Sequence, residues 1–482
     1  MAFNAILKKT GLIGPVAFCA GLVLLSVSPL FRGGNRQVVM IGLEAMGLLI
    51  LVALAFGAAF PTFIATTKRR ASSNALCAGL SWLEWCLLAS PIVLGLIYLT
   101  PIPIEWWMET GGRSIYDTAL ASVGVAASSI RPLSLNPEAT WTSLLAGLPL
   151  VAAYLLGRLC SPAQLRLVCK ILVASAFFQV AVGVLQLAAG GESLLYFDGG
   201  YPDSAIGTFA NRSHFANYLA MILPLYAWLA FATDAFDQSS RVPYKNHQSI
   251  RGRSILVGRL LWVVGGFIIV LGILASRSRG AALTGLPMGL LAVMVVASVR
   301  SGQTGWRFGA LLIAFMCAAT VALLGVDFLT SRFQSGQFGQ AASFRTVLAS
   351  STLVGAMEFW PWGAGWGAYE SVYPRFQPAL VGGYVEHAHH DYVQVLFDGG
   401  IFGVALLALW GCLFAWGAYC LVRSFRSSGA ADPNTMLSLA CGLALMGVML
   451  HAIAEFSMHI PANAIVAALL AGIYLRSIRP LR

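Results

Sequence analysis

The densest group of polar side chains in the sequence lies at residues 386–392, in the order Glu-His-Ala-His-His-Asp-Tyr. Its imidazoles are His387, His389 and His390, three of the seven histidines in the chain. Histidine changes its charge near neutral pH, so it can serve as a general base beside a reacting hydroxyl. The cluster is therefore the first candidate for catalysis.

Two other interpretations of these histidines remain open at this point. The first is a solvated loop end without a function. The second is a metal site, because imidazole and carboxylate groups are common metal ligands. In an extended chain, His387 and His389 would project to the same side, as two ligands of one metal ion would need.

Arginine forms a second set of candidates. Arg277 and Arg279 lie in the Ser-Arg-Ser-Arg-Gly turn at 276–280, between two apolar segments. Arginine beside a membrane span often marks an anionic ligand or a transport path, and its guanidinium binds phosphate oxygens in pairs. Snorkelling toward lipid headgroups is the alternative. Arg345 and Arg212 are weaker candidates, because an ordinary surface arginine would look the same.

The elements that position these residues are predicted to be membrane helices. Of 482 residues, 58% are apolar and only 10% are charged, whereas soluble proteins carry about 25% charged residues. Runs of about 20 apolar residues can cross a bilayer, where the backbone must satisfy its own hydrogen bonds as helix. We predict an all-α polytopic membrane protein with about twelve transmembrane helices. The expected spans are 11–30, 38–64, 75–100, 140–157, 171–190, 213–233, 260–276, 281–298, 309–327, 394–422, 434–455 and 463–476.

The charge distribution predicts how these helices are oriented. The net charge is +11, and most basic residues lie in short segments that share one side if both termini are cytoplasmic. That pattern follows the positive-inside rule and argues against a nucleic-acid-binding surface. The outer segments are then 101–139, 191–212 and 328–393, the last a large loop between the ninth and tenth helices. Trp106 and Trp107 in the first of these are typical of an interfacial helix.

Several motifs resemble the O-antigen ligase family, which includes WaaL-type ligases, Wzy-type polymerases and bacterial O-oligosaccharyltransferases. The family pattern has a histidine, then Asn, Ser or Gln, nine residues, a glycine, two residues, and a Gly, Thr or Tyr. His389, Gly400 and Gly403 fit this spacing. The sequence departs from the pattern at the second position, where it has His390.

Other parts of the chain add to the resemblance. The Ser-Arg-Gly turn matches Arg279, and the arginine before the Gly- and Trp-rich part of the large loop matches Arg345. Gly207-Thr208-Phe209, Asn211 and His214-Phe215 also fit. The resemblance covers roughly residues 200–410 and suggests three regions. These are N-terminal transmembrane helices at 1–200, a catalytic region with its periplasmic loop at 201–410, and C-terminal transmembrane helices at 411–482.

The resemblance implies an inverting, metal-independent glycosyltransferase of the GT-C kind, without a cofactor, in the bacterial inner membrane. The implied donor is an undecaprenyl-diphosphate-linked glycan, and the acceptor is a glycan, lipid A-core or protein hydroxyl at the periplasmic face. By this resemblance His389 is the base, and Arg279 and Arg345 bind the diphosphate. His387, His390 and Asp391 would orient the base or the acceptor, and Arg212 and Arg277 would contact glycan or phosphate.

The sequence leaves two alternatives open. Ligase, polymerase and protein oligosaccharyltransferase share the same motifs. A polytopic transporter or flippase of a lipid-linked or small anionic substrate is also compatible with the many spans. Carriers usually bind near the bilayer midplane, but the ionisable residues in or near the expected spans suggest no obvious relay. These residues are Glu44, Glu84, His451 and Glu455.

Overall fold

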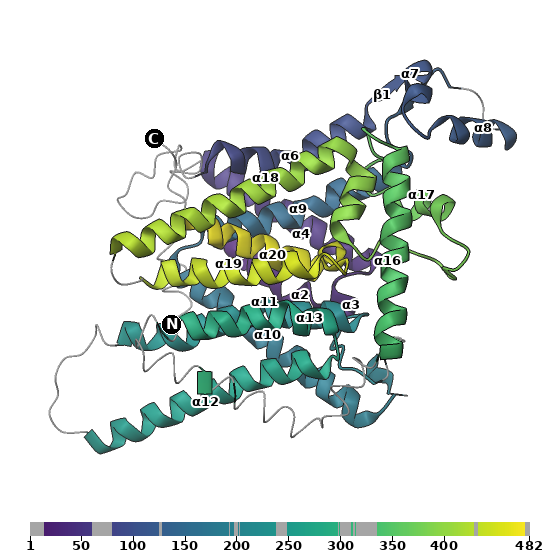
Figure 1. The fold of residues 1–482 in the computed structure, drawn as a ribbon. Coiled ribbons are helices and arrows are strands. Elements are labelled where there is room, and N and C mark those ends of the chain that lie inside the picture. The colour runs from purple at the N-terminus through teal and green to yellow at the C-terminus, as the bar shows by residue number, and fades with distance from the viewer. Residues whose placement is uncertain are drawn as a thin grey trace.

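The structure is a computed structural model in which long helices run side by side, and one helix, α16, lies across their ends (Figure 1). We call this end of the bundle the α16 end. The described residues are 14–59, 80–124, 128–191, 193–196, 201, 203–237, 248–296, 298, 310, 311, 314, 335–428 and 432–477.

The bundle is formed by helices from all parts of the chain. They are α2 (Pro15–Val27), α3 (Leu30–Gly33), α4 (Gln37–Ala59), α6 (Trp82–Leu99), α9 (Pro137–Leu159), α10 (Pro162–Ala189), α11 (Arg212–Asp237), α12 (Gln248–Ala275), α13 (Arg279–Leu283), α18 (Asp391–Ser428), α19 (Pro433–His451) and α20 (Pro461–Tyr474). The remaining elements are β1 (Pro101–Pro103), α7 (Ile104–Glu109), α8 (Ser114–Ser122), β2 (Ile130–Pro132), η3 (Leu194–Tyr196), α16 (Ser335–Glu358), α17 (Tyr369–Val372), η6 (Tyr373–Phe376), η7 (Ser457–His459) and η8 (Leu475–Ser477).

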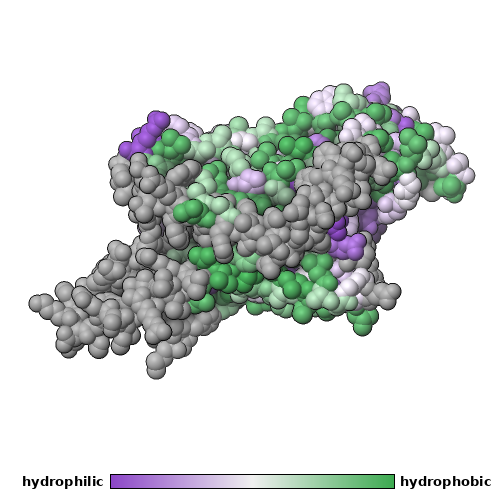
Figure 2. All heavy atoms as spheres, turned by 60° about the horizontal axis from the view of Figure 1, so that its bottom comes forward, coloured by the Kyte–Doolittle hydropathy of each residue, from purple (hydrophilic) through white to green (hydrophobic). Residues whose placement is uncertain are grey.

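Many of these helices have the length and composition of membrane spans. Among the described residues, seven are long and apolar enough to cross a bilayer, and three further apolar helices are shorter. Figure 2 shows that the coloured part of one face is mostly hydrophobic. The protein is therefore a multi-pass, mainly helical membrane protein, as predicted. The exact number of spans and the GT-C architecture stay predictions, and most of the span expected at 309–327 lies outside the described residues.

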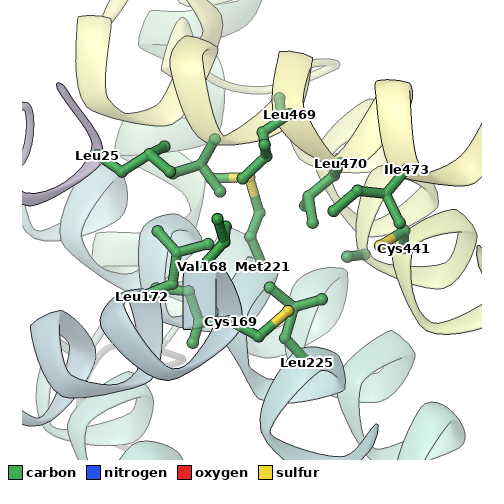
Figure 3. Close-up of a cluster of buried hydrophobic side chains, with 14 of the residues drawn as sticks. Leu25, Val168, Cys169, Leu172, Met221, Leu225, Cys441, Leu469, Leu470 and Ile473 are labelled. Atoms are coloured by element: carbon green, nitrogen blue, oxygen red, sulfur yellow. The ribbon is translucent and has the colours of Figure 1, made fainter. Parts of the chain in front are cut away.

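The interior of the bundle is apolar and closely packed. Leu25, Val168, Met221, Cys441 and Leu469 meet where α2, α10, α11, α19 and α20 converge (Figure 3). Glycines allow α9 and α20 to approach each other closely. A Cβ atom on Gly157 would collide with the carbonyl oxygen of Leu469, and one on Gly472 with that of Tyr154. Small residues at helix contacts are typical of membrane proteins, because they let two backbones pack directly.

Two of the expected outer segments contain more structure than predicted. Residues 101–139 include a short antiparallel ribbon in which Pro101 pairs with Pro132, so the fold is not purely α-helical. The segment also contains α7, with Trp106 and Trp107. The expected loop at 328–393 contains the 24-residue helix α16. Hydropathy could not reveal α16, because a helix outside the apolar core of a bilayer need not be strongly hydrophobic.

A buried arginine joins these two outer segments. Arg113 is fully buried, and its Nη2 donates hydrogen bonds to the carbonyl oxygens of Leu133, at 2.8 Å, and Gly363, at 2.7 Å. Burial lowers the pKa of Arg113 to about 10, so the side chain is still charged at neutral pH. The guanidinium therefore anchors the segment before α9 to the segment after α16.

We expect Arg113→Ala to destabilise the protein by about 2–4 kcal/mol, because buried carbonyl groups lose a charged donor. Thermal unfolding in mild detergent would measure the effect. Arg375→Ala is a matched control, since Arg375 pairs with Glu358 where both side chains are about one third exposed. Exposed pairs contribute about 0–1 kcal/mol. Equal losses for the two variants would contradict the anchoring role of Arg113.

Candidate active site

The candidate site is formed at the α16 end, where α18 begins and α19 ends. The backbone N–H of Asp391 donates to the carbonyl of Ala452 at 3.0 Å, and the Tyr392 hydroxyl donates to the carbonyl of Met449 at 2.7 Å. These bonds fix the histidine-rich segment before α18 against the segment at 452–460, which connects α19 to α20. The site thus combines residues that are far apart in sequence.

Phe456 is the centre of a cluster of imidazole rings. The His387 ring stacks on it with centroids 4.5 Å apart, and the His389 ring meets it edge-on at 4.7 Å. His214, from the start of α11, packs on the same phenyl ring at 4.6 Å. An aromatic ring that contacts three imidazoles restricts their orientations and therefore preorganises the site.

His389 has an unusual backbone conformation. Its φ angle is +51°, a region that non-glycine residues rarely adopt. Such strain persists only where surrounding contacts enforce it, and it is frequent at functional sites. The side chain is 27% exposed, and its Nδ1 lies 3.4 Å from Oε2 of Glu455. This separation is longer than a well-formed hydrogen bond, but it is close enough for electrostatic attraction.

Glu455 connects His389 to Arg345. Its side chain is only 1% exposed, and its Oε1 accepts a short hydrogen bond from Nη2 of Arg345 on α16. Burial by itself would raise the pKa of Glu455, but His389 and the Arg345 guanidinium outweigh burial and hold that pKa well below its usual range. A carboxylate therefore lies between an imidazole and a guanidinium.

The turn with Arg279 is placed against the same end of α19. Arg279 is the first residue of α13, and Ser278 caps this helix by accepting a hydrogen bond from the Ala281 N–H at 3.3 Å. A Cβ on Gly280 would lie 2.6 Å from Cε1 of His451, the last residue of α19. The missing side chain at Gly280 lets the backbone of this turn pack against the His451 ring.

Arg212 and Arg277 contact two residues that precede α11, Tyr201 and Asp203. The Arg212 guanidinium lies 4.8 Å above the ring of Tyr201. Arg277 has a φ angle of +55°, and its Nη1 donates to the carbonyl oxygen of Asp203 at 3.3 Å. Both arginines thus contact the segment before α11. A substrate contact by either remains a prediction.

The other predicted residues have different surroundings. The Nδ1 atom of His387 lies 3.2 Å from the amide nitrogen Nε2 of Gln394. Burial lowers the pKa of His387 well below its ordinary value. His390 is half-buried, and its Nδ1 accepts the Val393 N–H at 3.4 Å. Burial also lowers the pKa of His390. Neutral imidazoles therefore flank His389 on its own segment.

Asp391 pairs with His459 rather than with His389. The Nδ1 of His459 donates to Oδ1 of Asp391 at 2.7 Å, and the backbone N–H of Met458 donates to the other carboxylate oxygen at 3.3 Å. Burial would lower the pKa of His459, but Asp391 outweighs it and raises that pKa. Asp391 therefore fixes the connecting segment around Phe456.

The sequence analysis missed Glu455 as a site residue, although a signal was present. Glu455 and His451 stood out as ionisable residues in the expected span 434–455. An acid inside an apolar segment is a functional candidate in itself. The helix ends at His451, so Glu455 is free to turn into the site. His214 belonged to the His214-Phe215 segment of the family resemblance but was not named as a site residue, and His459 carried no comparable signal. The remaining histidine, His247, lies outside the described residues.

Within the described ranges, no group of three or more His, Cys, Asp or Glu side chains is arranged to hold a metal ion. The metal interpretation of His387 and His389 therefore gains no support from this part of the chain. Both imidazoles pack on Phe456 instead.

Part of the chain matches a known protein family. Residues 264–408 match the family model described as O-antigen ligase, a stretch that contains Arg277, Arg279, Arg345 and His389. No curated protein matches the chain. The matched family acts in polysaccharide assembly and implies a glycosyltransferase-type enzyme with a lipid-linked glycan donor and a glycan acceptor.

Proposed function

We propose that the chain transfers a glycan from undecaprenyl diphosphate to an acceptor hydroxyl at the periplasmic face of the inner membrane, and the match of residues 264–408 to the O-antigen ligase family model supports this proposal. One observation carries this proposal: His389 and Arg345 meet through Glu455 at the end of the bundle where Arg279 also lies. A base and phosphate-binding cations are thus gathered beside the membrane spans.

The proposed reaction is a single displacement at the anomeric carbon. His389 removes the proton from the acceptor hydroxyl, and the acceptor oxygen forms a bond to the anomeric carbon. The bond from that carbon to the diphosphate oxygen breaks, and its electron pair leaves with undecaprenyl diphosphate. This displacement inverts the configuration and needs no metal ion, because guanidinium groups can stabilise the charge that grows on the leaving group.

Arg279 and Arg345 are the proposed ligands of the diphosphate. Guanidinium groups bind phosphate oxygens through paired hydrogen bonds. Arg345 projects from α16 and Arg279 from the start of α13, so the two approach the site from different elements. Arg212 and Arg277 are proposed to contact glycan or phosphate nearby.

The charge distribution supports the proposed orientation. At the opposite end of the bundle, Arg476 donates hydrogen bonds to the carbonyls of Gly157, at 3.2 Å, and Cys160, at 2.6 Å. Arg158, Arg166 and Lys170 belong to the same end, where α9 ends and α10 begins. Basic residues favour the cytoplasmic side. This distribution favours a cytoplasmic location for that end and a periplasmic one for the α16 end.

The transporter alternative gains less support. A carrier would bind its substrate near the middle of its spans. The polar groups at issue instead lie where α11, α13 and α18 begin and α19 ends. Glu84, one of the acids in a predicted span, pairs with Arg158 at the opposite end. No specific observation therefore favours transport over transfer.

The direct test uses purified protein, an undecaprenyl-diphosphate-linked oligosaccharide and a panel of acceptors. We expect mass spectrometry to find the extended acceptor together with free undecaprenyl diphosphate. The panel contains an acceptor glycan, a lipid A-core acceptor and a second lipid-linked repeat unit. Transfer to lipid A-core would indicate a ligase, and transfer to the second repeat unit would indicate a polymerase. Movement of the lipid-linked glycan across reconstituted vesicles, without any transfer product, would instead identify a flippase.

We expect Arg279→Ala to reduce transfer about 100- to 1000-fold, the usual effect of losing one preorganised electrostatic group. Arg279→Lys should lose less, because lysine keeps the charge but not the paired hydrogen bonds. Transfer rates at saturating acceptor would measure both. Wild-type rates in Arg279→Ala, at equal protein level, would exclude Arg279 from diphosphate binding.

A further inference from the structure

We propose that Glu455 is a positioning residue that fixes the ring of His389 for catalysis and holds Arg345 beside it. The inference rests on the proposed glycan transfer, and it assigns a role to a residue outside the matched segment 264–408. Glu455 lies in the segment between α19 and η7, at 452–456. It is a buried acid that faces both functional groups of the site.

The two oxygens of Glu455 face different partners. Oε1 accepts the short hydrogen bond from Arg345, and Oε2 lies 3.4 Å from Nδ1 of His389. A carboxylate buried to this degree requires compensation by charge or hydrogen bonds. Arg345 and His389 provide that compensation, so the position of each group depends on the same side chain.

The contact with Nδ1 selects the useful form of the His389 imidazole. In neutral imidazole one ring nitrogen carries the proton and the other accepts one. A carboxylate beside Nδ1 favours the proton at Nδ1 and leaves the Nε2 lone pair available. Phe456 supports the edge of the same ring at 4.7 Å. Nε2 is then the nitrogen that takes the proton of the acceptor hydroxyl.

The contact with Arg345 links donor binding to the base. A diphosphate that binds Arg345 competes with Oε1 of Glu455 for the same guanidinium. Weakening of that ion pair leaves more of the negative charge of Glu455 to act on His389. Donor binding would thereby strengthen the interaction that stabilises the imidazolium formed when the acceptor loses its proton.

Other charged and titratable groups also surround His389, so any pH effect must be separated from theirs. They come from four elements and from the segment of His389 itself: Arg345 on α16, His214 on α11, His451 on α19, His459 on η7, and His387 and His390. Of these groups, and among the described residues, only Arg345 forms an ion pair with the carboxylate of Glu455.

The first experiment compares Glu455→Gln and Glu455→Asp with the wild-type protein in the transfer assay. We expect Glu455→Gln to lower kcat about 100-fold without raising KM for the donor, because Arg345 keeps its charge. Its acidic pH–rate limb should move to lower pH, since a neighbouring carboxylate favours protonated imidazole. Glu455→Asp should restore part of kcat. Glu370→Gln is the control, since Glu370 is exposed and accepts a hydrogen bond from Tyr384.

A second measurement does not depend on activity. Diethyl pyrocarbonate modifies neutral imidazole, and mass spectrometry of the peptide with His389 follows the modification against pH. We expect the midpoint for His389 to move to lower pH in Glu455→Gln and to stay at the wild-type value in Glu370→Gln. This measurement also reports on proteins that show no transfer.

The outcomes separate the two proposals. An active wild type with a slow Glu455→Gln variant and both pH shifts supports the positioning role. If the wild type is active but Glu455→Gln keeps the wild-type kcat, or the His389 midpoint does not shift in this variant, the positioning role is overturned and the proposed transfer stays intact. If the wild type shows no transfer but the His389 midpoint still shifts in Glu455→Gln, the proposed function is overturned, while the contact between Glu455 and His389 stands.

Discussion

Replacement of His389 by alanine is expected to lower glycan transfer by about 1000-fold or more while leaving the protein folded. General-base catalysis contributes about 100- to 10,000-fold, and His389 is the imidazole that faces the carboxylate of Glu455. The residue is 27% exposed, and its φ angle of +51° is unfavourable. Alanine leaves the ion pair between Glu455 and Arg345 in place, so we expect the protein to stay folded. Transfer would be measured with purified lipid-linked oligosaccharide.

Two comparisons make this prediction specific. His390→Ala should have a smaller effect, because the His390 imidazole accepts the Val393 N–H at the start of α18. Protein level and thermal unfolding should match the wild type in both variants. Retained transfer in His389→Ala would remove the proposed mechanism, and an equal loss in His390→Ala would question which imidazole is the base.

The second large effect is expected at the other end of the bundle. Glu84 is fully buried, and Arg158 donates to it through Nε at 2.6 Å and Nη2 at 3.1 Å. The Tyr154 hydroxyl donates to Oε1 at 2.6 Å, and Ser81 donates from its backbone and side chain to Oε2. Arg158→Ala would leave this carboxylate without its cation. We expect a loss of about 3–5 kcal/mol in unfolding free energy.

Detergent unfolding of purified protein would measure this loss, and two variants control for it. Tyr154→Phe removes one hydrogen bond only and should destabilise by about 1 kcal/mol. The double variant Arg158→Leu with Glu84→Leu removes the buried pair and should recover much of the stability. If Arg158→Ala behaved like Tyr154→Phe, the ion pair would not be a major anchor between α6 and α9.

Local sequence patterns predicted most helix positions. The expected spans 140–157, 394–422 and 463–476 correspond to α9, α18 and α20, because long apolar runs can be satisfied only as helices in lipid. The patterns failed at α16 and at the β1–β2 ribbon. Long-range contacts such as the hydrogen bond from Arg113 to Gly363 hold the segments that contain these elements together. A local sequence pattern cannot predict such contacts.

Composition by itself determined that the chain is a helical membrane protein, and short motifs that resemble the O-antigen ligase family made His389, Arg279 and Arg345 candidate catalytic groups. These features depend on local hydropathy and on short motifs, both of which can be recognised from the sequence. Only the tertiary structure decided that Glu455 lies between His389 and Arg345, that Asp391 pairs with His459, and that Phe456 gathers three imidazoles. The physical reason is that these contacts join segments that are far apart in the sequence and lie at the ends of different helices, so the packing of the helices sets their distances.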